Sequence, residues 1–551
     1  MTDNPSGALL KLVLHRDFRR FSLTVIAAEA LAVIFSSISP LVQKYMIDAT
    51  NASQGWIVVR AAVILSILLA GQFALRSLAR VVRGVLSIRL RKTLKSRIFR
   101  HLLALPEDFL RSRGAGYFFN RIQHDAGEIC VFASGGALAL PGEGIKLLAA
   151  MGMIVVLDWR CAVLLLPFLV LQGLICYFFR KRQYALSLQL QECVASERHL
   201  MQEYLTNHTA LKTHVADHSA GDRIDSGLKR WSKLMFSRLT HENIFLGCLQ
   251  IPVWLCGGII LLGGLYLVIH NRSTLGEVWA LLLLMNLVFA PSRTLGTLLV
   301  QQQAAVAAWN RMQEVFQQHT EDQEGCGSEE KPVDLRGDLI IENVDFAYHA
   351  DRRVISGLDL RVAYGSGVFL CGANGSGKST LFSLLLRLYA PQRGTIRINK
   401  CNIADYPLGS YRSRIGYIGQ HPEFIRGTLR ENLLLGNTFR SDEEIGEIFR
   451  QLDCMELLER LPERLDAQVA ERGENFSGGE RLRLALVREL LRDSDWLLFD
   501  EAAANLDMAG RQTFYNLLQK LPGSKSVIAI VHDLPERSNW PILQLETLQK
   551  K

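Results

Sequence analysis

Apolar residues are concentrated in the first three hundred positions of the chain, where they form runs of membrane-spanning length. These runs occupy residues 21–47, 56–79, 136–157, 161–179, 244–269 and 275–297. A helix rises about 1.5 Å per residue, so about 20 apolar residues cross the roughly 30 Å of hydrocarbon in a bilayer. The pattern therefore predicts an all-α polytopic membrane domain with six transmembrane helices, spread over residues 1–317.

The connectors between these runs differ in length and in charge. Those after spans one, three and five are short and carry few basic residues, whereas those after spans two and four, about 80–133 and 180–243, are long and rich in Lys and Arg. Positively charged connectors face the cytoplasm, so both long connectors and both termini are expected there. An apolar period of helical spacing continues through both and predicts helices that project beyond the bilayer. Solvated helices without a further role explain that period equally well.

A change of composition separates this region from the rest of the chain. Residues 318–336 are acidic and nearly free of large apolar side chains, as in a linker. In residues 337–551, short β-rich stretches such as 367–372 and 496–500 alternate with helical ones. This alternation predicts an α/β domain with a largely parallel sheet.

Composition and charge favour a membrane protein over a nucleic-acid-binding one. Apolar residues make up 49% of the 551, and the formal net charge is +8. Because much of the Lys and Arg flanks the apolar runs, the charge indicates membrane topology and no nucleic-acid partner. The ten cysteines show no CxxC or metal-ligand spacing and are expected to be reduced. No signal-peptide pattern precedes span one, so insertion is expected to use the spans themselves.

The stretch GANGSGKST, residues 372–380, follows a strand-like run and leads into a helical one. Gly372, Gly377, Lys378 and Ser379 have the spacing of a P-loop, and the strand–loop–helix context makes the match specific. In such a loop, backbone N–H groups surround phosphate oxygens, the lysine reaches the β and γ phosphates, and the serine can bind Mg²⁺. A structural Gly-rich turn is the weaker alternative. The second domain is therefore predicted to be a P-loop NTPase.

Two further motifs accompany the P-loop. The apolar strand at 496–500 ends in Asp500 and Glu501, which suit an Mg²⁺ ligand and a group that polarises the attacking water. Ser477, Gly478 and Gly479 open a helical segment whose free N–H groups could form a second anion site. Taken alone, both motifs are explained as well or better by ordinary helix caps.

Together these motifs closely resemble those of the ATP-binding cassette (ABC) transporters, and the likeness covers essentially the whole chain. The resemblance implies ATP and Mg²⁺ as cofactors, with Tyr348 stacking on adenine and Gln420, Asp507 and His532 in the Gln loop, the D-loop and the switch position. The implied site residues are catalytic Glu501 and His532; Mg²⁺-binding Ser379, Gln420 and Asp500; and ATP-binding Tyr348, Gly372, Asn374, Gly375, Ser376, Gly377, Lys378, Ser379, Thr380, Gln420, Ser477, Gly478, Gly479, Glu480 and Asp507.

The chain departs from the family pattern in three places. Glu480 stands where glutamine is commoner, which adds a negative charge near nucleotide and could tune activity. After Glu501 the sequence reads AAAN, which could alter the stiffness of the D-loop. Only nineteen residues follow His532, so the usual C-terminal tail is expected to be absent.

In this family the signature of one cassette covers the nucleotide held by another. A chain with six spans and one cassette therefore resembles an exporter-type half-transporter, which works as a homodimer or with a related second chain. The resemblance also implies short transverse segments near 111–119 and 205–216 that dock on the cassettes. The expected location is the bacterial inner membrane, with the cassette and both termini in the cytoplasm.

The predicted function is ATP-driven export, or flipping, of an amphipathic peptide, lipid or drug-like molecule by alternating access. Membrane lipid and the transported substrate are thus expected partners. A peptidase domain is not expected, because only about twenty residues precede span one. An ATP-gated channel or regulator, a soluble or DNA-associated ATPase, and an importer are the alternatives. Ionisable residues in or near the spans are Glu29, Arg60, Arg76, Glu143, Lys146 and Glu277, of which Glu143 and Lys146 could simply neutralise each other.

Overall fold

The computed structural model describes Gly7 and residues 15–52, 54–321, 333–348, 352–435, 440–504, 506–521, 523, 525–531 and 539–549. Contacts divide the chain into two compact units, of which one contains residues 1–100 and 116–317, and the other residues 101–115 and 318–551. The predicted limits of the membrane domain (1–317), linker (318–336) and cassette (337–551) stay a prediction, because residues 322–332 lie outside the described part.

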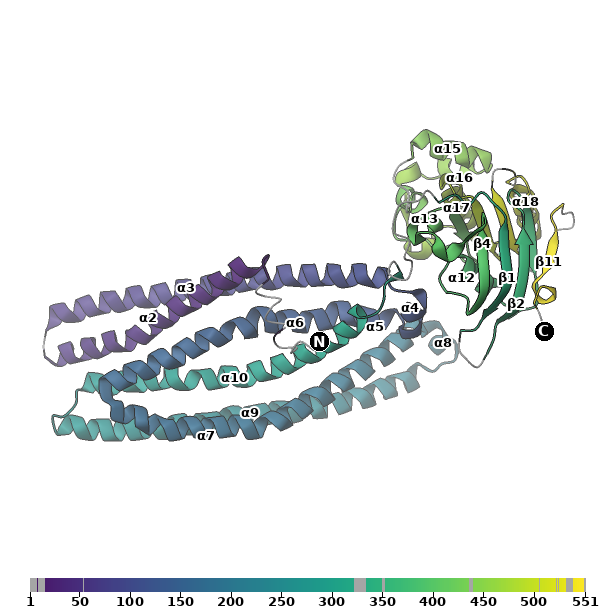
Figure 1. The fold of residues 1–551 in the computed structure, drawn as a ribbon. Coiled ribbons are helices and arrows are strands. Elements are labelled where there is room, and N and C mark those ends of the chain that lie inside the picture. Colours follow the sequence, from purple (N-terminus) through teal and green to yellow (C-terminus); the bar gives the residue numbers. More distant parts are fainter. Residues whose placement is uncertain are drawn as a thin grey trace. The chain divides into compact units, whose positions relative to one another are not determined.

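The N-terminal half of the chain consists of long helices and short segments between them (Figure 1). In chain order these are α2 (Arg19–Asn51), α3 (Gly55–Leu103), α4 (Glu107–Arg113), α5 (Ala115–Asn120), the π-helical turn η1 (Arg121–Asp125), α6 (Ala126–Val131), the π-helical turn η2 (Phe132–Gly136), α7 (Ala137–Thr206), α8 (His208–Thr213), α9 (Asp217–Ile269) and α10 (Leu275–Phe316).

Every predicted span lies within, or almost within, one of these helices. Five described helical stretches are long and apolar enough to cross a membrane, and the stretch at 115–206 contains the third and fourth predicted spans. Those two spans are separated inside α7 by Asp158, whose φ of −156° and ψ of 106° are not helical. The short helices α4 and α8 overlap or adjoin the predicted transverse segments, whose docking on cassettes stays a prediction.

The core of the helical unit forms where α7, α9 and α10 pack against one another. Ala150 and Leu165 of α7 meet Cys256 of α9 and Leu284 of α10, and all four are buried. Outside this apolar core, Asp125 is completely buried, and its carboxylate accepts from Arg311 at 2.6 Å and from Arg121 at 2.8 Å. A buried carboxylate needs such partners, so this ion pair fixes α10 to η1.

The ionisable residues named above for the spans have polar or aromatic partners in the described part of the chain. Lys146 donates to Glu143 at 2.8 Å, as the neutralising interpretation predicts. Lys44 pairs with Glu277 at 2.8 Å, and Arg83 pairs with Glu29. The guanidinium of Arg60 lies 5.2 Å from the centre of the Trp56 ring, and Arg76 lies beside Gln72. These contacts lower the cost of keeping charge near hydrocarbon.

The second unit has the strands and helices of an α/β domain. Its strands are β1 (Leu339–Phe346), β2 (Ile355–Val362), β3 (Gly367–Cys371), β4 (Arg393–Ile398), β5 (Cys401–Asn402), β6 (Ile415–Ile418), β7 (Gly427–Thr428), β8 (Gln468–Val469), β9 (Trp496–Asp500), β10 (Ser526–Ile530) and β11 (Ile542–Gln544). Its helices are α12 (Lys378–Leu385), α13 (Leu408–Ser413), α14 (Leu429–Leu433), α15 (Asp442–Gln451), α16 (Met455–Glu459), α17 (Gly478–Leu491) and α18 (Met508–Leu518), with 3₁₀ turns η3 (Ile403–Asp405), η4 (Arg464–Asp466), η5 (Glu471–Gly473) and η6 (Leu545–Thr547).

Two main sheets build this unit. The first is fully parallel, with five strands in the order β11-β3-β10-β9-β6, and the second is antiparallel, in the order β2-β1-β4-β5. The predicted largely parallel sheet corresponds to the first, and the antiparallel sheet adds strands that were not predicted, such as β2. Strands β9 and β10 are buried along their full length, which explains their nearly continuous apolar sequence.

The register of the parallel sheet brings the functional motifs to one edge. Ile530 of β10 pairs with Asp500 of β9, and Ile418 of β6 pairs with Phe499. The P-loop follows β3, which is the neighbour of β10 on the other side. Ligands of open α/β sheets bind at the carboxyl ends of such strands.

Candidate nucleotide-binding site

The P-loop connects β3 to α12 and has the backbone of a phosphate cradle. Gly375 and Gly377 adopt φ values of 84° and 98°, a region that only glycine occupies at little cost. This turn places the first N–H groups of α12 around one small volume, with the positive end of the helix behind it. The geometry suits a bound phosphate chain.

Two observations test whether a triphosphate fits this loop. The hydroxyl of Ser376 is buried and has no hydrogen-bond partner in the described structure, so it could donate to a phosphate oxygen. The ammonium of Lys378 donates to the carbonyls of Gly372 at 2.7 Å and Ala373 at 3.0 Å, which keeps the buried cation at the loop. Both groups therefore fit the phosphates of ATP.

The end of the chain holds the P-loop in place, which the sequence did not indicate. The amide of Ala373 donates to Glu546 Oε1 at 2.6 Å, and Gln549 Nε2 donates to the carbonyl of Ser376 at 3.0 Å. Nothing in the local pattern points to these contacts, since 173 residues separate the members of each pair.

The predicted Mg²⁺ ligands meet at the end of β9. Ser379 Oγ donates to Asp500 Oδ1 at 3.1 Å, so a hydroxyl and a carboxylate, both oxygen donors that Mg²⁺ prefers, lie side by side. The hydroxyl of Tyr417, on β6, is 3.5 Å from Asp500 Oδ2. Burial raises the pKa of Asp500, and burial together with the nearby Asp500 raises the pKa of Tyr417 to about 12.

Tyr417 was missed as a site residue, although its position in the sequence carried a signal. It lies on β6, the strand that leads to the predicted Gln420, and β6 runs parallel to β9 and ends at the same sheet edge as Asp500. Because its pKa is about 12, the phenol stays protonated at neutral pH and can donate to the Asp500 carboxylate. Gln420 itself is exposed just after β6.

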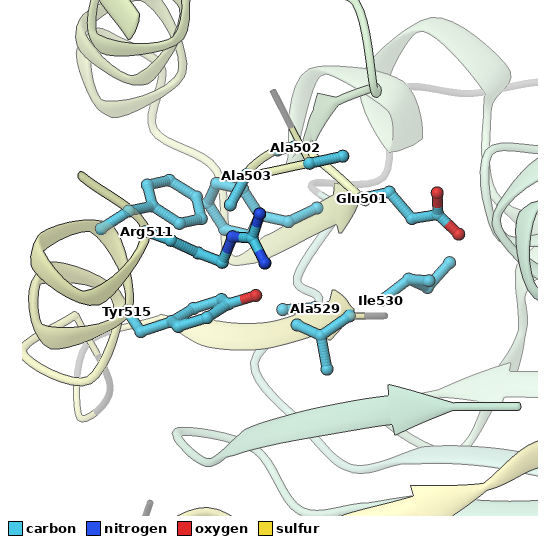
Figure 2. Close-up of a pocket in the computed structure, with 11 residues that line it drawn as sticks. Glu501, Ala502, Ala503, Arg511, Tyr515, Ala529 and Ile530 are labelled. Carbon is cyan, nitrogen blue, oxygen red and sulfur yellow. The ribbon is translucent and has the colours of Figure 1, made fainter. Parts of the chain in front are cut away.

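Glu501 follows β9 directly and has an unusual backbone. Its φ of 48° is left-handed, which for a residue with a side chain is strained by roughly 1–3 kcal/mol and is typical of functional sites. The Glu501 amide donates to the carbonyl of Ile530 at 3.2 Å, which holds this conformation. Figure 2 shows the Glu501 side chain directed away from Arg511 and Tyr515, which line an adjoining cavity of about 250 Å³.

The three alanines after Glu501 account for much of that cavity. Ala502, Ala503 and Ala504 all line it, and Arg511 extends into it from α18 (Figure 2). Arg511 also donates to the carbonyl of Leu506, at 3.3 Å, just before the predicted D-loop residue Asp507. The small side chains of Ala502, Ala503 and Ala504 therefore leave space close to the segment that leads to Asp507.

The signature segment begins α17 with a capping box. Ser477 Oγ accepts from the amide of Glu480 at 3.3 Å, and Glu480 Oε2 accepts from the amide of Ser477 at 2.8 Å. These hydrogen bonds agree with the interpretation of the motif as an ordinary helix cap. Gly478 and Gly479 form the partly exposed first positions of α17.

The carboxylate of Glu480 does not stand as an isolated charge. It pairs with Arg460, and although burial opposes the shift, the amide of Ser477 and Arg460 together lower the pKa of Glu480. The expected extra negative charge near nucleotide is therefore neutralised within the cassette.

We predict that Glu480→Gln will change ATPase activity by no more than about twofold, since the amide oxygen can still cap α17. Glu480→Ala should lower the free energy of unfolding by about 1 kcal/mol and reduce activity, because the amide of Ser477 loses its side-chain acceptor and Arg460 loses its ion-pair partner. Glu444 has the same capping box with Ser441, so Glu444→Ala is a matched control that should lose stability alone. Thermal unfolding measures the stability of each variant, and ATPase rates measure its activity. A large effect of Glu480→Gln on the ATPase rate would contradict a purely capping role of Glu480.

The remaining predicted residues lie as follows. The hydroxyl of Tyr348 is 3.1 Å from Thr380 Oγ1, so the proposed adenine-stacking ring adjoins the helix that begins with Lys378. Asp507 caps α18 and accepts from the amide of Gly510 at 2.9 Å. Asn374 lies in the P-loop turn and is exposed. His532 lies outside the described residues.

Comparison with known proteins places this geometry in a family. A family model of the ABC transporter transmembrane region matches residues 22–292, and one of the ABC transporter cassette matches residues 355–504. Together these models cover well over half of the chain. The chain belongs to the ABC transporter family. This transporter fuses one transmembrane region to one cassette, which is the architecture of a half-transporter.

Curated relatives of the transporter align over most of their own length. It is 28% identical over 452 residues (81% of this chain, 76% of the relative) to the ATP-dependent lipid A-core flippase of Chromobacterium violaceum. It is 26% identical over 470 residues (84% and 78%) to a multidrug resistance ABC transporter ATP-binding and permease protein of Lactococcus lactis. It is 25% identical over 498 residues (90% and 86%) to the uncharacterized ABC transporter ATP-binding protein YwjA of Bacillus subtilis.

A solved structure shares the fold of the whole transporter. A bacterial Atm1-family ABC exporter with ATP bound matches with a TM-score of 0.84 and 22% sequence identity, over 98% of this chain and 94% of that one. The predicted fold class, a helical membrane domain fused to an α/β cassette, is thereby confirmed.

Proposed function

We propose that this half-transporter works as a homodimer that exports or flips an amphipathic substrate, driven by ATP hydrolysis at sites shared between two cassettes. The observation that carries the proposal is the meeting of Ser379, Asp500 and Glu501 beside the P-loop. These are the groups that metal binding and water activation require in phosphoryl transfer. They are part of a chain whose other half is a transmembrane region.

In the proposed site, Ser379 and Asp500, with help from Gln420, would hold Mg²⁺, which would supply positive charge against the phosphates. Lys378 binds the β and γ phosphates from below, and the amides at the start of α12 hold them in place. Glu501 would orient and polarise the attacking water. For His532, which lies outside the described residues, we propose a contact with the γ phosphate on the sequence motif alone. The start of α17 in the second chain covers the nucleotide from the other side.

The proposed orientation follows from the charge of the connectors. The regions after spans two and four are basic, which favours the cytoplasm for them, for the cassette and for both termini. Bacterial relatives support a location in the inner membrane. ATP binding would close the cassettes and switch the spans from inward-facing to outward-facing, and hydrolysis would reset them.

The pairing of ionisable residues supports an amphipathic substrate. With Glu143 bound to Lys146 and Glu277 bound to Lys44, few charges are left to recognise an ion or a sugar. Two relatives are named for moving lipid A-core and for multidrug resistance, and such molecules have large apolar parts.

A transport assay tests this function. In vesicles that contain the purified transporter, Mg²⁺ and ATP should move fluorescent phospholipid or apolar dye across the bilayer, and cargo should change the ATPase rate. Vesicles with the Glu501→Gln variant are the control and should show no movement. ATP-dependent ion conductance without movement of any amphipathic molecule would favour the channel instead. Activity only after addition of a different half-transporter would indicate a heterodimer.

A further inference from the structure

A basic cavity lies between the start of α2 and the C-terminal part of α3, far from the nucleotide site in the sequence. It has a volume of about 600 Å³. The residues that define the basic cavity are Phe18, Arg89, Lys92, Ser96, Arg97 and Arg100. Because α3 has 3.6 residues per turn, its four cations share one face and point into the same space.

The positive charge of the basic cavity is not compensated within the described structure. No carboxylate among the described residues forms an ion pair with Arg89, Lys92, Arg97 or Arg100. One carboxylate, that of Asp17, also lines the cavity, and it lies 3.4 Å from His15. Four cations against one carboxylate make the space attractive to an anion.

Along α2, the basic cavity begins at the predicted boundary of the membrane, whereas along α3 its first cation, Arg89, lies ten residues beyond the predicted end of the second span at residue 79. The guanidinium of Arg89 lies 4.6 Å from the centre of the Phe21 ring, and Phe21 is the first residue of the first predicted span. From this level the row of cations continues along α3 for eleven residues, or about 16 Å, to Arg100. Headgroup phosphates lie just outside the hydrocarbon, where this row starts.

We propose that the basic cavity binds the phosphate-bearing headgroup of an anionic phospholipid from the surrounding bilayer. Basic pockets between helices at a membrane surface bind such headgroups. Long Lys and Arg side chains can reach toward the phosphates while their stems cover apolar surface. The alternative source of the same chemistry, free phosphate, lacks the acyl chains that would lie beside Phe18 and Phe21.

Two substitutions test the proposal without removing packing contacts. Arg89 and Arg97 stack on Phe21 and Phe316, so the test variant is Lys92→Gln combined with Arg100→Gln. The matched control is Lys181→Gln combined with Arg182→Gln, which removes the same charge from the other basic connector. Native mass spectrometry of the full-length protein, incubated with cardiolipin or with phosphatidylcholine, measures retained lipid.

We expect the test variant to bind cardiolipin roughly 25-fold more weakly, since each cation near a membrane surface contributes about a fivefold factor. Phosphatidylcholine binding should not change, and the control should resemble the unaltered protein. Asp17→Asn should shift retention in the opposite direction and strengthen it, which a purely structural role of these residues would not produce. ATPase activity in phosphatidylcholine vesicles reports that each variant is folded.

Three results would overturn the proposal. Equal loss of cardiolipin in test and control variants would indicate general surface attraction. Displacement of cardiolipin by millimolar inorganic phosphate at constant ionic strength would assign the basic cavity to free phosphate. Loss of dimerisation in the test variant, with lipid binding unchanged, would assign the cavity to the contact between chains.

Discussion

Replacing Glu501 with glutamine should abolish ATP turnover and leave ATP binding intact. The carboxylate is expected to orient and polarise the attacking water, and glutamine has the same shape without the charge. Loss of a group in this role lowers kcat by roughly 10²–10⁴-fold. ATP binding depends on Lys378 and the P-loop amides, which the substitution does not touch. The variant should therefore accumulate as a closed, ATP-bound dimer.

The backbone at Glu501 provides a second variant that separates chemistry from structure. A φ of 48° suits glycine, so Glu501→Gly should be inactive but at least as stable as the original protein. Glu463→Gln, an exposed change elsewhere in the cassette, should affect neither property. ATPase rates, binding of a fluorescent ATP analogue and cross-linking of the cassettes measure these effects. Normal turnover by Glu501→Gln would remove Glu501 from its proposed role.

Local features of the site were predictable because they leave periodic or compositional signals. In the loop after β3, Gly375 and Gly377 occupy the positions with positive φ, and α12 begins at Lys378 as the strand–loop–helix context predicts. The apolar run of β9 ends at Asp500, where the buried strand reaches the sheet edge that carries the site. The roles of these residues stay predictions, but their placement follows from short-range rules.

Features that depend on distant residues were not predictable in this way. The contacts of Glu546 and Gln549 with the P-loop join parts of the chain that only the folded sheet brings together. The neutralisation of Glu480 by Arg460 likewise requires the packing of α16 near α17.

Replacing Lys378 with alanine should weaken ATP binding severely. The buried ammonium is the one side-chain cation that the described P-loop offers to the phosphates, and its loss removes charge-assisted hydrogen bonds worth about 1.5–3 kcal/mol each. We expect ATP affinity to fall by roughly 10²-fold or more. Lys525→Ala is a matched control, because Lys525 is also partly buried and donates to a backbone carbonyl, that of Ser494, at 2.7 Å. The Lys525→Ala variant should lose stability but keep its affinity for ATP. Unchanged ATP binding by Lys378→Ala would contradict the P-loop assignment.

The same variant distinguishes a shared site from a site within one chain. If each site combines Lys378 of one chain with Ser477 of its partner, a dimer of one Lys378→Ala chain and one Ser477→Arg chain has one site with both defects and one intact site. Random mixing of equal amounts should then restore about a quarter of the full ATPase rate, since half of the dimers are mixed. A chain that carries both substitutions, mixed with unaltered protein, produces mixed dimers in which each site has one defect, so only the unaltered dimers contribute activity. Two results together would show that each cassette hydrolyses ATP alone. The mixture of Lys378→Ala and Ser477→Arg chains would recover no ATPase activity, and the ATPase rate per unaltered chain would be the same with and without the chain that carries both substitutions.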